Sequence, residues 1–217
     1  MNFSYQTIFH NLPYLIAAAK WTLLISGAGM AISILLGIFI CAARISNKPW
    51  LKRTAALYIS YFRGVPLLVQ LLIFYYMLPS IGLNLPAIAA AILAVGMCSA
   101  AYTAEILRGA LQTIPPGQTE AAYALGLTPV WLWVLILVPQ ALRLGMPSLV
   151  NELILLVKVS SLASVVGIAE LTRVAQNITG ATYRPLEIYI TAALIYFVIN
   201  LVISLLGRLA ERRLQIS

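Results

Sequence analysis

The chain has 217 residues, of which 62% are hydrophobic and only 9% are charged, with a mean hydropathy of +0.95. A water-soluble domain carries roughly 25% charged residues, so this composition excludes an ordinary soluble fold and predicts a protein of the lipid bilayer. The net charge of +8 does not indicate nucleic-acid binding, because Lys and Arg lie at the ends of apolar segments rather than on a basic face interleaved with aromatic residues.

Long apolar segments predict five transmembrane helices. A spanning helix needs about 20 apolar residues, because each adds ~1.5 Å against a hydrocarbon core of ~30 Å. In chain order we expect these spans at residues 14–43, 55–78, 87–111, 148–169 and 187–208. Apart from a few polar interruptions, the runs are continuously apolar rather than alternating, which favours helices over a closed barrel. The expected fold is therefore an all-α membrane protein with residues 1–217 as a single transmembrane domain.

Small residues recur at intervals of four on the first and third of these spans. They are Gly29, Ser33 and Gly37 on the first span, and Gly96, Ala100 and Ala104 on the third. Such faces let two helix backbones approach closely in lipid, so we interpret all six as packing residues. The two cysteines lie in separate apolar segments without neighbouring ligands, and we expect no metal site.

The second span carries polar groups in an apolar environment. Arg63 lies about eight residues into it and is followed by Gly64 and Pro66, which can break the helix and free backbone groups to line a cavity. We expect Arg63 to form an intramembrane ion pair with Glu105 of the third span; contact with substrate is the alternative. Gln70 offers an amide well inside the apolar span, and we expect it to line a polar pathway through the helices.

Residues 121–142 are also uncharged, but they include Pro129 and Pro139. Proline inside a helix costs ~3 kcal/mol, which argues against a sixth span. We expect a cytoplasmic loop at about residues 115–140 that begins with an amphipathic helix and is stopped by Gly126. Its later part, around residues 131–138, would dip into the membrane or pack on the bundle.

The fourth span contains ionisable and hydroxyl groups. Lys158 lies 12 residues before Glu170, or ~18 Å along a helix, and ionisable residues at such depth are costly and usually functional. We expect Lys158, Ser160 and Ser161 to line the pathway; an interhelical structural pair is the alternative for Lys158. Glu152 is either a gate-side residue of the pathway or a cap near the start of this span.

The distribution of basic residues predicts the orientation of the chain. They gather after the first span, after the third span and at the C-terminus: Arg44, Lys48, Lys52, Arg53, Arg108, Arg143, Arg208, Arg212 and Arg213. The opposite side has no charge at all between Pro79 and Pro86. Because Lys and Arg mark cytoplasmic loops, the N-terminus is expected outside and the C-terminus in the cytoplasm.

One motif in the cytoplasmic loop resembles a known family. The segment Gly-Gln-Thr-Glu-Ala-Ala at residues 117–122 is followed by Gly126, six positions after the Glu, and then by Ile136 and Pro139. This pattern is similar to the EAA loop of ABC import permeases, although Val138 replaces the usual leucine. In that family the short helix docks on the ATPase subunit. The resemblance therefore assigns ATPase coupling to Gly117, Glu120, Ala121, Ala122 and Gly126.

Further stretches resemble the polar amino-acid subgroup, which includes the glutamine and histidine permeases. They lie at residues 62–70, 101–109, 139–143 and 167–173. That subgroup commonly has Lys-Asp-Thr-Ser-Leu in the fourth span, where this chain has Lys-Val-Ser-Ser-Leu. The acid is replaced by Val159, which lowers the expectation of a cationic substrate.

The resemblance implies a type I ABC importer permease that carries polar amino acids across the inner membrane of a bacterial cell. Its partners would be ATPase subunits, a second copy or a homologous permease, and an extracytoplasmic substrate-binding protein. The sequence has no G-x-x-x-x-G-K-[ST] phosphate loop, so ATP would be bound by the partner, and no cofactor is expected. The alternative is a self-contained secondary carrier or channel, which is disfavoured because no internal repeat is visible. An enzyme is not expected, because acid–base or metal groups do not cluster.

Overall fold

A computed structural model describes residues 3–215, and within this range every regular element is a helix. The elements are α1 (Tyr5–Ile45), α2 (Pro49–Gly64), α3 (Leu67–Ser80), α4 (Ala87–Gln112), α5 (Pro116–Ala124), α6 (Pro129–Leu132), the π-helical turn η1 (Trp133–Leu137), α7 (Val138–Val159), the 3-10 turn η2 (Ser160–Val166), α8 (Leu171–Thr182) and α9 (Pro185–Gln215). Within the described range, four helical segments are long and apolar enough to cross a membrane, and a fifth crossing results if α2 and α3 form one bent span. The first, third and fifth predicted spans lie entirely within α1, α4 and α9, as expected.

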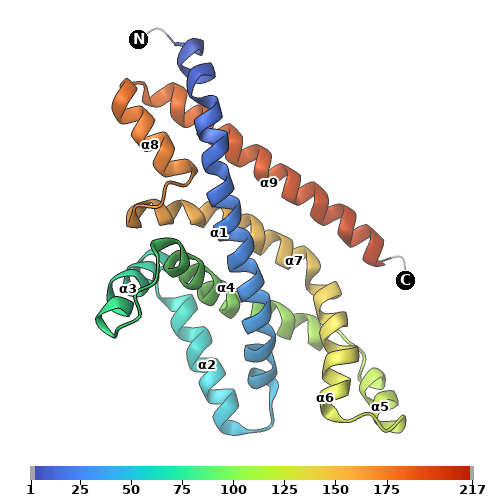
Figure 1. Cartoon of the computed structure of the whole chain (residues 1–217). Coiled ribbons are helices and arrows are strands. Elements are labelled where there is room, and N and C mark those ends of the chain that lie inside the picture. Colours follow the sequence, from blue (N-terminus) through green and yellow to red (C-terminus); the bar gives the residue numbers. More distant parts are fainter. Residues whose placement is uncertain (1–2, 216–217) are drawn as a thin grey trace.

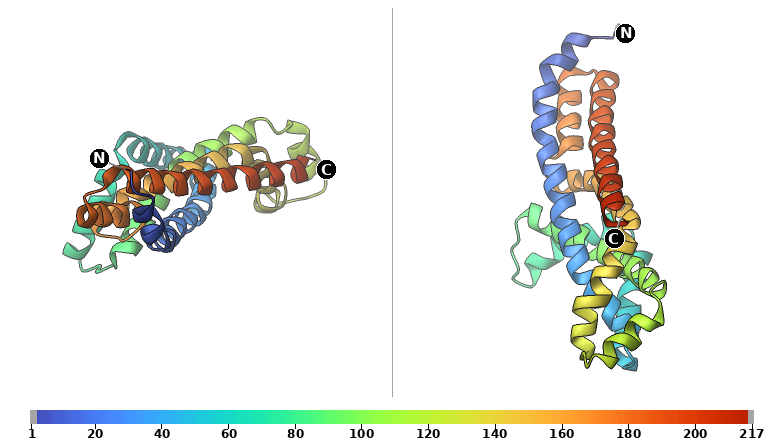
Figure 2. Two further views of the ribbon diagram at one scale, coloured as in Figure 1. Left: turned by 90° about the horizontal axis from the view of Figure 1, so that it is seen from above. Right: turned by 90° about the vertical axis from the view of Figure 1, so that its right-hand side faces the viewer.

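The molecule is elongated, and its two ends carry different elements (Figures 1 and 2). The N-terminal part of α1, α8 and the beginning of α9 form one end. The end of α1, the beginning of α2, and α5 and α6 form the other end, which we call the α5 end. The basic loop after α1 and the motif-bearing loop are therefore brought to the same end of the molecule.

The small residues of α1 and α4 face each other, as predicted. A Cβ atom added to Gly37 would lie 2.7 Å from Cγ2 of Thr103, and one added to Gly29 would lie 2.8 Å from Cγ1 of Val95. Between these two contacts, the buried Ser33 hydroxyl donates to Ser99 Oγ at 2.9 Å. The two backbones approach so closely because no larger side chain separates them.

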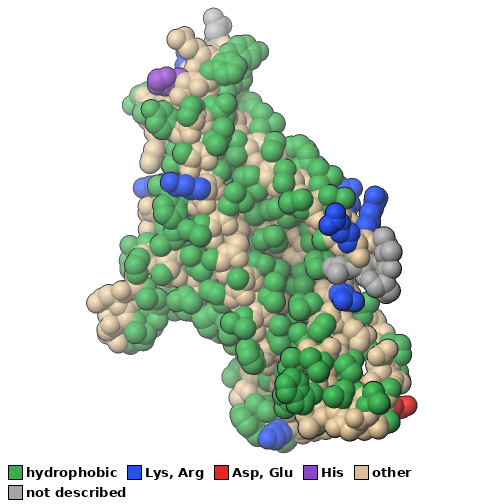
Figure 3. Space-filling model, turned by 45° about the vertical axis from the view of Figure 1, so that its right-hand side comes forward, with side chains coloured by type: hydrophobic (Ala, Val, Ile, Leu, Met, Phe, Trp, Pro, Cys, Tyr) green, Lys and Arg blue, Asp and Glu red, His purple; other side chains and the backbone are tan. Residues whose placement is uncertain are grey.

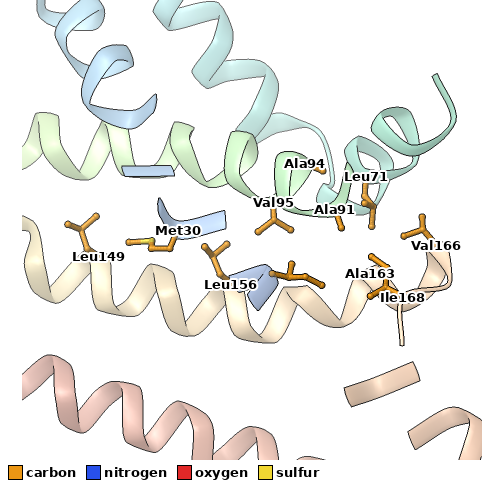
Figure 4. Packing of buried hydrophobic residues seen from close by; sticks show 11 residues of the cluster. Met30, Leu71, Ala91, Ala94, Val95, Leu149, Leu156, Ala163, Val166 and Ile168 are labelled. Carbon is orange, nitrogen blue, oxygen red and sulfur yellow. The ribbon is translucent and has the colours of Figure 1, made fainter. Parts of the chain in front are cut away.

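The main apolar core lies where four helices meet around this contact (Figure 4). Met30 of α1, Leu71 of α3, Val95 of α4 and Leu156 of α7 are all buried in one cluster, which Val166 of η2 closes. The core thus joins the first half of the chain to α7 and holds the cavity described below between α2, α3, α4 and α7.

Replacement of Gly37 by Ala is expected to destabilise the bundle. The new Cβ would meet Thr103 at 2.7 Å and the backbone nitrogen of Ala104 at 3.3 Å, so α1 and α4 must move apart. Overpacking of this kind costs about 1–3 kcal/mol. The matched control is Gly27→Ala on the same helix, where nothing lies within 4 Å of the new atom. Thermal unfolding in detergent measures both variants, and equal midpoints would contradict the close packing.

The predicted continuous span at residues 55–78 is corrected by the structure. The chain forms two helices there, α2 and α3, which are bent by 104° at their junction. Pro66 ends α2, because proline has no backbone N–H to donate to the carbonyl four residues earlier, and α3 begins directly after it. The amide nitrogen of Gln70 donates to the carbonyl oxygens of Phe62 at 3.0 Å and Val65 at 2.7 Å, which the break leaves without helical partners. Gln70 therefore stabilises the break.

The fourth helix begins earlier than predicted. The helical segment runs without interruption from Pro129 to Val166, whereas the sequence predicted a cytoplasmic loop at about residues 115–140 and a span that begins at residue 148. The π-helical turn η1 lies immediately before α7 and widens the helix, which accommodates Pro139 and its missing N–H. Leu132 and Ala141 are buried, so this part packs on the bundle, which was one of the two predicted alternatives.

The helix also ends earlier than predicted, at Val159, and continues as the turn η2. Gly167 then reverses the chain with a φ of +82°, a left-handed conformation that favours glycine. The buried Glu170 carboxylate accepts the backbone N–H groups of Thr172 and Arg173 and so caps α8. Burial raises the pKa of this carboxyl, while the two backbone donors act in the opposite direction.

Candidate functional site

A cavity of about 320 Å³ opens at the break between α2 and α3. The break itself lines one side, from Arg63 to Leu67, and residues of α4 and α7 line the other. Its charged side chains are Arg63 and Glu152, and its polar side chains include those of Ser99 and Tyr102. This volume lies at the lower end of the range of small-molecule sites.

Glu152 is the carboxylate of this cavity, and a chain of hydroxyl groups holds it in place. The residue is only 8% exposed, and Ser99 Oγ donates to its Oε1 atom at 2.6 Å. Ser33 donates in turn to Ser99 at 2.9 Å and lies 2.6 Å from the hydroxyl of Thr103. The packing face of α1 and α4 therefore also positions the carboxylate. Sequence analysis assigned Ser33 to packing alone and did not identify Ser99 or Thr103; the i, i+4 spacing of these two on one helix was the available signal.

Arg63 and Glu105 each have a different partner from the one predicted. The guanidinium of Arg63 lies over the Tyr102 ring, 5.3 Å from its centroid. Glu105 instead pairs with Arg108, one turn further along α4, at 2.7 Å. A partner at i+3 on the same helix is reached without any tertiary adjustment. Arg63 is thereby left facing the cavity without a carboxylate among the described residues at ion-pairing distance.

The three residues predicted for the pathway at the end of α7 lie outside the lining of this cavity. Lys158 is exposed, Ser160 is buried and donates to a backbone carbonyl at 2.9 Å, and Ser161 donates to the carbonyl of Lys158 at 2.7 Å. The residue of this segment that lines the cavity is Val159, two turns beyond Glu152 on α7. The position where the subgroup commonly has an acid therefore faces the same space as Glu152.

The predicted coupling residues form a short surface helix, α5. Gly117, Glu120 and Ala121 are exposed, whereas Ala122 is 1% exposed and anchors the helix. The predicted stop at Gly126 is confirmed: α5 ends at Ala124, and Gly126 follows in the left-handed region with a φ of +76°.

Large apolar side chains are exposed beside these residues. Tyr123, Leu125, Val130 and Trp131 are 53%, 83%, 68% and 55% exposed, respectively. They lie on α5, on α6 and in the loop between them, at one extremity of the molecule (Figure 1). Figure 3 shows that hydrophobic side chains cover most of the drawn face and that Lys and Arg side chains form small separate groups. Exposed apolar patches of this kind are contact surfaces for other proteins or for the membrane.

A family model described as the inner membrane component of binding-protein-dependent transport systems matches residues 29–216. The chain belongs to this family. The permease is therefore a transport protein and not an enzyme. Membership implies that it works with an ATPase subunit and a substrate-binding protein.

Relatives of the permease are named as permeases of amino-acid transport systems. A probable amino-acid ABC transporter permease of Bacillus subtilis, YckA, is 38% identical over 97% of this chain and 93% of its own length. The glutamine transport system permease GlnP of Escherichia coli is 38% identical over the full length of both chains. The arginine transport system permease ArtQ of Bacillus subtilis is 37% identical over 99% of both chains.

Solved structures of two transporters have the same fold. One, described as an amino acid ABC transporter with histidines, has a TM-score of 0.86 and 40% identity over 98% of this chain and 100% of that chain. The MetNI methionine ABC transporter has a TM-score of 0.76 and 21% identity, over 98% of this chain and 99% of its own. The permease is thus a multi-pass, all-α membrane protein with the type I ABC importer architecture predicted from its sequence.

Proposed function

We propose that the permease imports a free polar amino acid across the bacterial inner membrane and that the cavity between α2, α3, α4 and α7 binds it as a zwitterion. The observation that carries this proposal is the presence of one cation, Arg63, and one carboxylate, Glu152, in the same space of about 320 Å³. The amino-acid names of the relatives support it.

The chemistry of the cavity suits both ends of an amino acid. Arg63 presents a guanidinium, whose planar fork pairs with a carboxylate in two parallel hydrogen bonds. Glu152 already accepts from Ser99 and has a second oxygen available for an ammonium group. Leu155, Leu156 and Val159 form apolar walls for the substrate side chain. A ligand with only one of the two charges would leave the opposite charge unpaired, so both charges contribute to selectivity.

The wider pathway and the partners follow from the same arrangement. Lys158, Ser160 and Ser161 flank the cavity residue Val159 in the chain and would line a further part of the pathway. The α5 end would face the cytoplasm, with the N-terminus outside, because the basic loop after α1 lies at the α5 end. Two permeases, identical or homologous, would form the complete pathway. The ATPase would dock on Gly117, Glu120, Ala121, Ala122 and Gly126 and drive alternating access.

The binding assay that tests this proposal uses the purified permease–ATPase complex without the binding protein. Radiolabelled neutral polar amino acids are expected to bind, and reconstituted vesicles with the binding protein are expected to take them up only with ATP. An N-acetyl amino acid and an amino acid methyl ester each lack one charge and should bind at least about tenfold more weakly. Equal affinity for these derivatives would contradict the zwitterion site, and uptake without ATP would favour a self-contained carrier.

Replacement of Gly126 by Val is expected to uncouple uptake from ATP hydrolysis. A side chain in the left-handed conformation costs about 1–2 kcal/mol, so the end of α5 would change shape. Nothing lies within 4 Å of the added Cβ, so the fold itself should persist. The number of substrate molecules imported per ATP is expected to fall roughly tenfold.

The matched control is Gly180→Ala on α8, away from the coupling loop, where the backbone is helical and the added Cβ also meets open space. This variant should retain coupling. Normal uptake by the Gly126→Val complex, with its ATPase subunit still bound, would remove the assignment of Gly126 to coupling.

A further inference from the structure

A second cavity, of about 520 Å³, lies at the α5 end of the bundle, apart from the substrate cavity. It is formed where the last turns of α1 and α4 meet the first turns of α2. Three basic side chains line it, those of Arg44, Lys52 and Arg108, together with Ile45, Leu111 and Gln112. The coupling and substrate residues discussed above do not include any of these six.

The cavity carries excess positive charge. Glu105 neutralises Arg108, with which it pairs at 2.7 Å. Among the described residues, no carboxylate lies within ion-pairing distance of Arg44 or Lys52, and the first 104 residues of the chain contain no Asp or Glu at all. The C-terminal ends of α1 and α4 contribute a partial charge of about −0.5 each, which still leaves the cavity net positive.

The chemistry of the lining suits a phosphate group. Arg44 is half-buried and Arg108 is 33% exposed, so both guanidinium groups are held close to the cavity wall. Arg44 can donate two parallel hydrogen bonds to phosphate oxygens, whereas Arg108 donates its Nε and Nη2 to Glu105 and has its other terminal nitrogen, Nη1, for a phosphate oxygen. Lys52 adds a more mobile point charge at the rim. A cavity built from two arginines of different helices and one lysine therefore offers more than a general surface potential.

The surroundings favour a lipid as the source of that phosphate. Ile45 and Leu111 line the cavity itself, and Ile45 is 44% exposed. Trp50, in the same first turn of α2 as Lys52, is 63% exposed, and exposed tryptophan is typical of the membrane–water interface. Basic pockets between transmembrane helices on the cytoplasmic side bind anionic lipid headgroups. Free phosphate would make no use of the apolar wall.

We propose that the cavity of Arg44, Lys52 and Arg108 binds the phosphate of an anionic phospholipid from the leaflet at the α5 end. A lipid bound there would contact the end of α1, the start of α2 and the end of α4. A single loop connects α4 to the coupling helix α5. This proposal rests on the proposed function in one respect only: if the α5 end faces the cytoplasm, the lipid comes from the cytoplasmic leaflet.

Native mass spectrometry of the permease–ATPase complex tests this site. The complex is exposed to a mixture of phosphatidylglycerol and phosphatidylcholine, and the retained lipid is counted. The unmodified complex is expected to retain phosphatidylglycerol selectively. The double variant Arg44→Gln, Lys52→Gln should retain it roughly 30-fold more weakly, because each cation near an anionic lipid contributes roughly fivefold.

The matched control is Arg212→Gln, Arg213→Gln, which removes two cations from the end of α9, outside the cavity. Its retention should be unchanged. Equal losses of phosphatidylglycerol retention in both double variants would show only a general electrostatic attraction to the lipid and would overturn the site. The conservative double variant Arg44→Lys, Lys52→Arg should restore retention if the fold is intact. Should the Gln variants fail to fold, retention by the unmodified complex must still fall steeply as sodium chloride is raised.

Two further arms separate the possible occupants. Inorganic phosphate that displaces phosphatidylglycerol at low millimolar concentration would assign the site to free phosphate instead of lipid. Loss of the ATPase subunit from the Gln variant, with lipid retention unchanged, would assign the cations to the partner protein. Either outcome overturns the proposal. Amino-acid binding, measured in the same samples, should be unaffected, so a failure here is distinguishable from a failure of the zwitterion site.

Discussion

Replacement of Glu152 by Gln is expected to abolish measurable amino-acid binding by the permease–ATPase complex. The change removes the negative charge that would pair with the substrate ammonium group, while the side chain keeps its length and can still accept from Ser99. Loss of one partner of a buried charge pair costs about 2–5 kcal/mol, or roughly 30-fold to several thousand-fold in affinity. Equilibrium binding and ATP-dependent uptake should fall together, because the lost contact acts on substrate and not on the ATPase.

The matched control is Glu187→Gln on α9. This carboxylate is 4% exposed, against 8% for Glu152, but it does not line the cavity. Its replacement should leave amino-acid affinity near that of the unmodified permease. Thermal unfolding of both variants separates loss of binding from loss of fold. Unchanged affinity in the Glu152 variant would mean that the cavity carboxylate does not contact the substrate.

Replacement of Val159 by Asp is expected to change the substrate preference in favour of arginine and lysine. Val159 lines the cavity, two turns from Glu152, so a carboxylate there would meet the side chain of a bound substrate. A hydrogen bond to a charged group contributes about 1.5–3 kcal/mol, so the affinity ratio of arginine to glutamine should rise roughly 10- to 150-fold. Lys158 would not neutralise the new acid, because adjacent residues of a helix point in different directions.

The variant Val159→Asn is the control for this change, since it has nearly the same shape as the Asp variant but no charge. It should not raise the arginine ratio. Competition binding with arginine and glutamine measures both variants against the unmodified permease, which is expected to prefer a neutral amino acid. The electrostatic interpretation would be wrong if the unmodified permease bound arginine or lysine best, or if the Asp and Asn variants behaved alike.

Features that depend on neighbours in the chain could be predicted from the sequence. The apolar lengths of α1, α4 and α9 follow from the thickness of a bilayer. The end of α5 follows from Gly126, because glycine adopts a positive φ without steric cost. The small residues at intervals of four predicted the contact of α1 with α4, because that spacing places them on one face. Each of these is a local property of backbone or periodicity.

The site depended on contacts between distant segments, which no local pattern contains. Ser99 and Glu152 are 53 residues apart in the chain, and their hydrogen bond exists only because α4 and α7 pack together. Glu105 forms its ion pair with Arg108 on the same helix rather than with Arg63, and Arg63 lines the cavity instead. The choice of Val159 over Lys158 as the lining residue depended on the rotation of α7 against α4, and helix rotation is set by side-chain packing. The sequence by itself thus determined the membrane spans, the helix stop and the family, whereas only the tertiary structure decided which charges share a cavity, because a helix carries side chains on every face and its neighbours select among them.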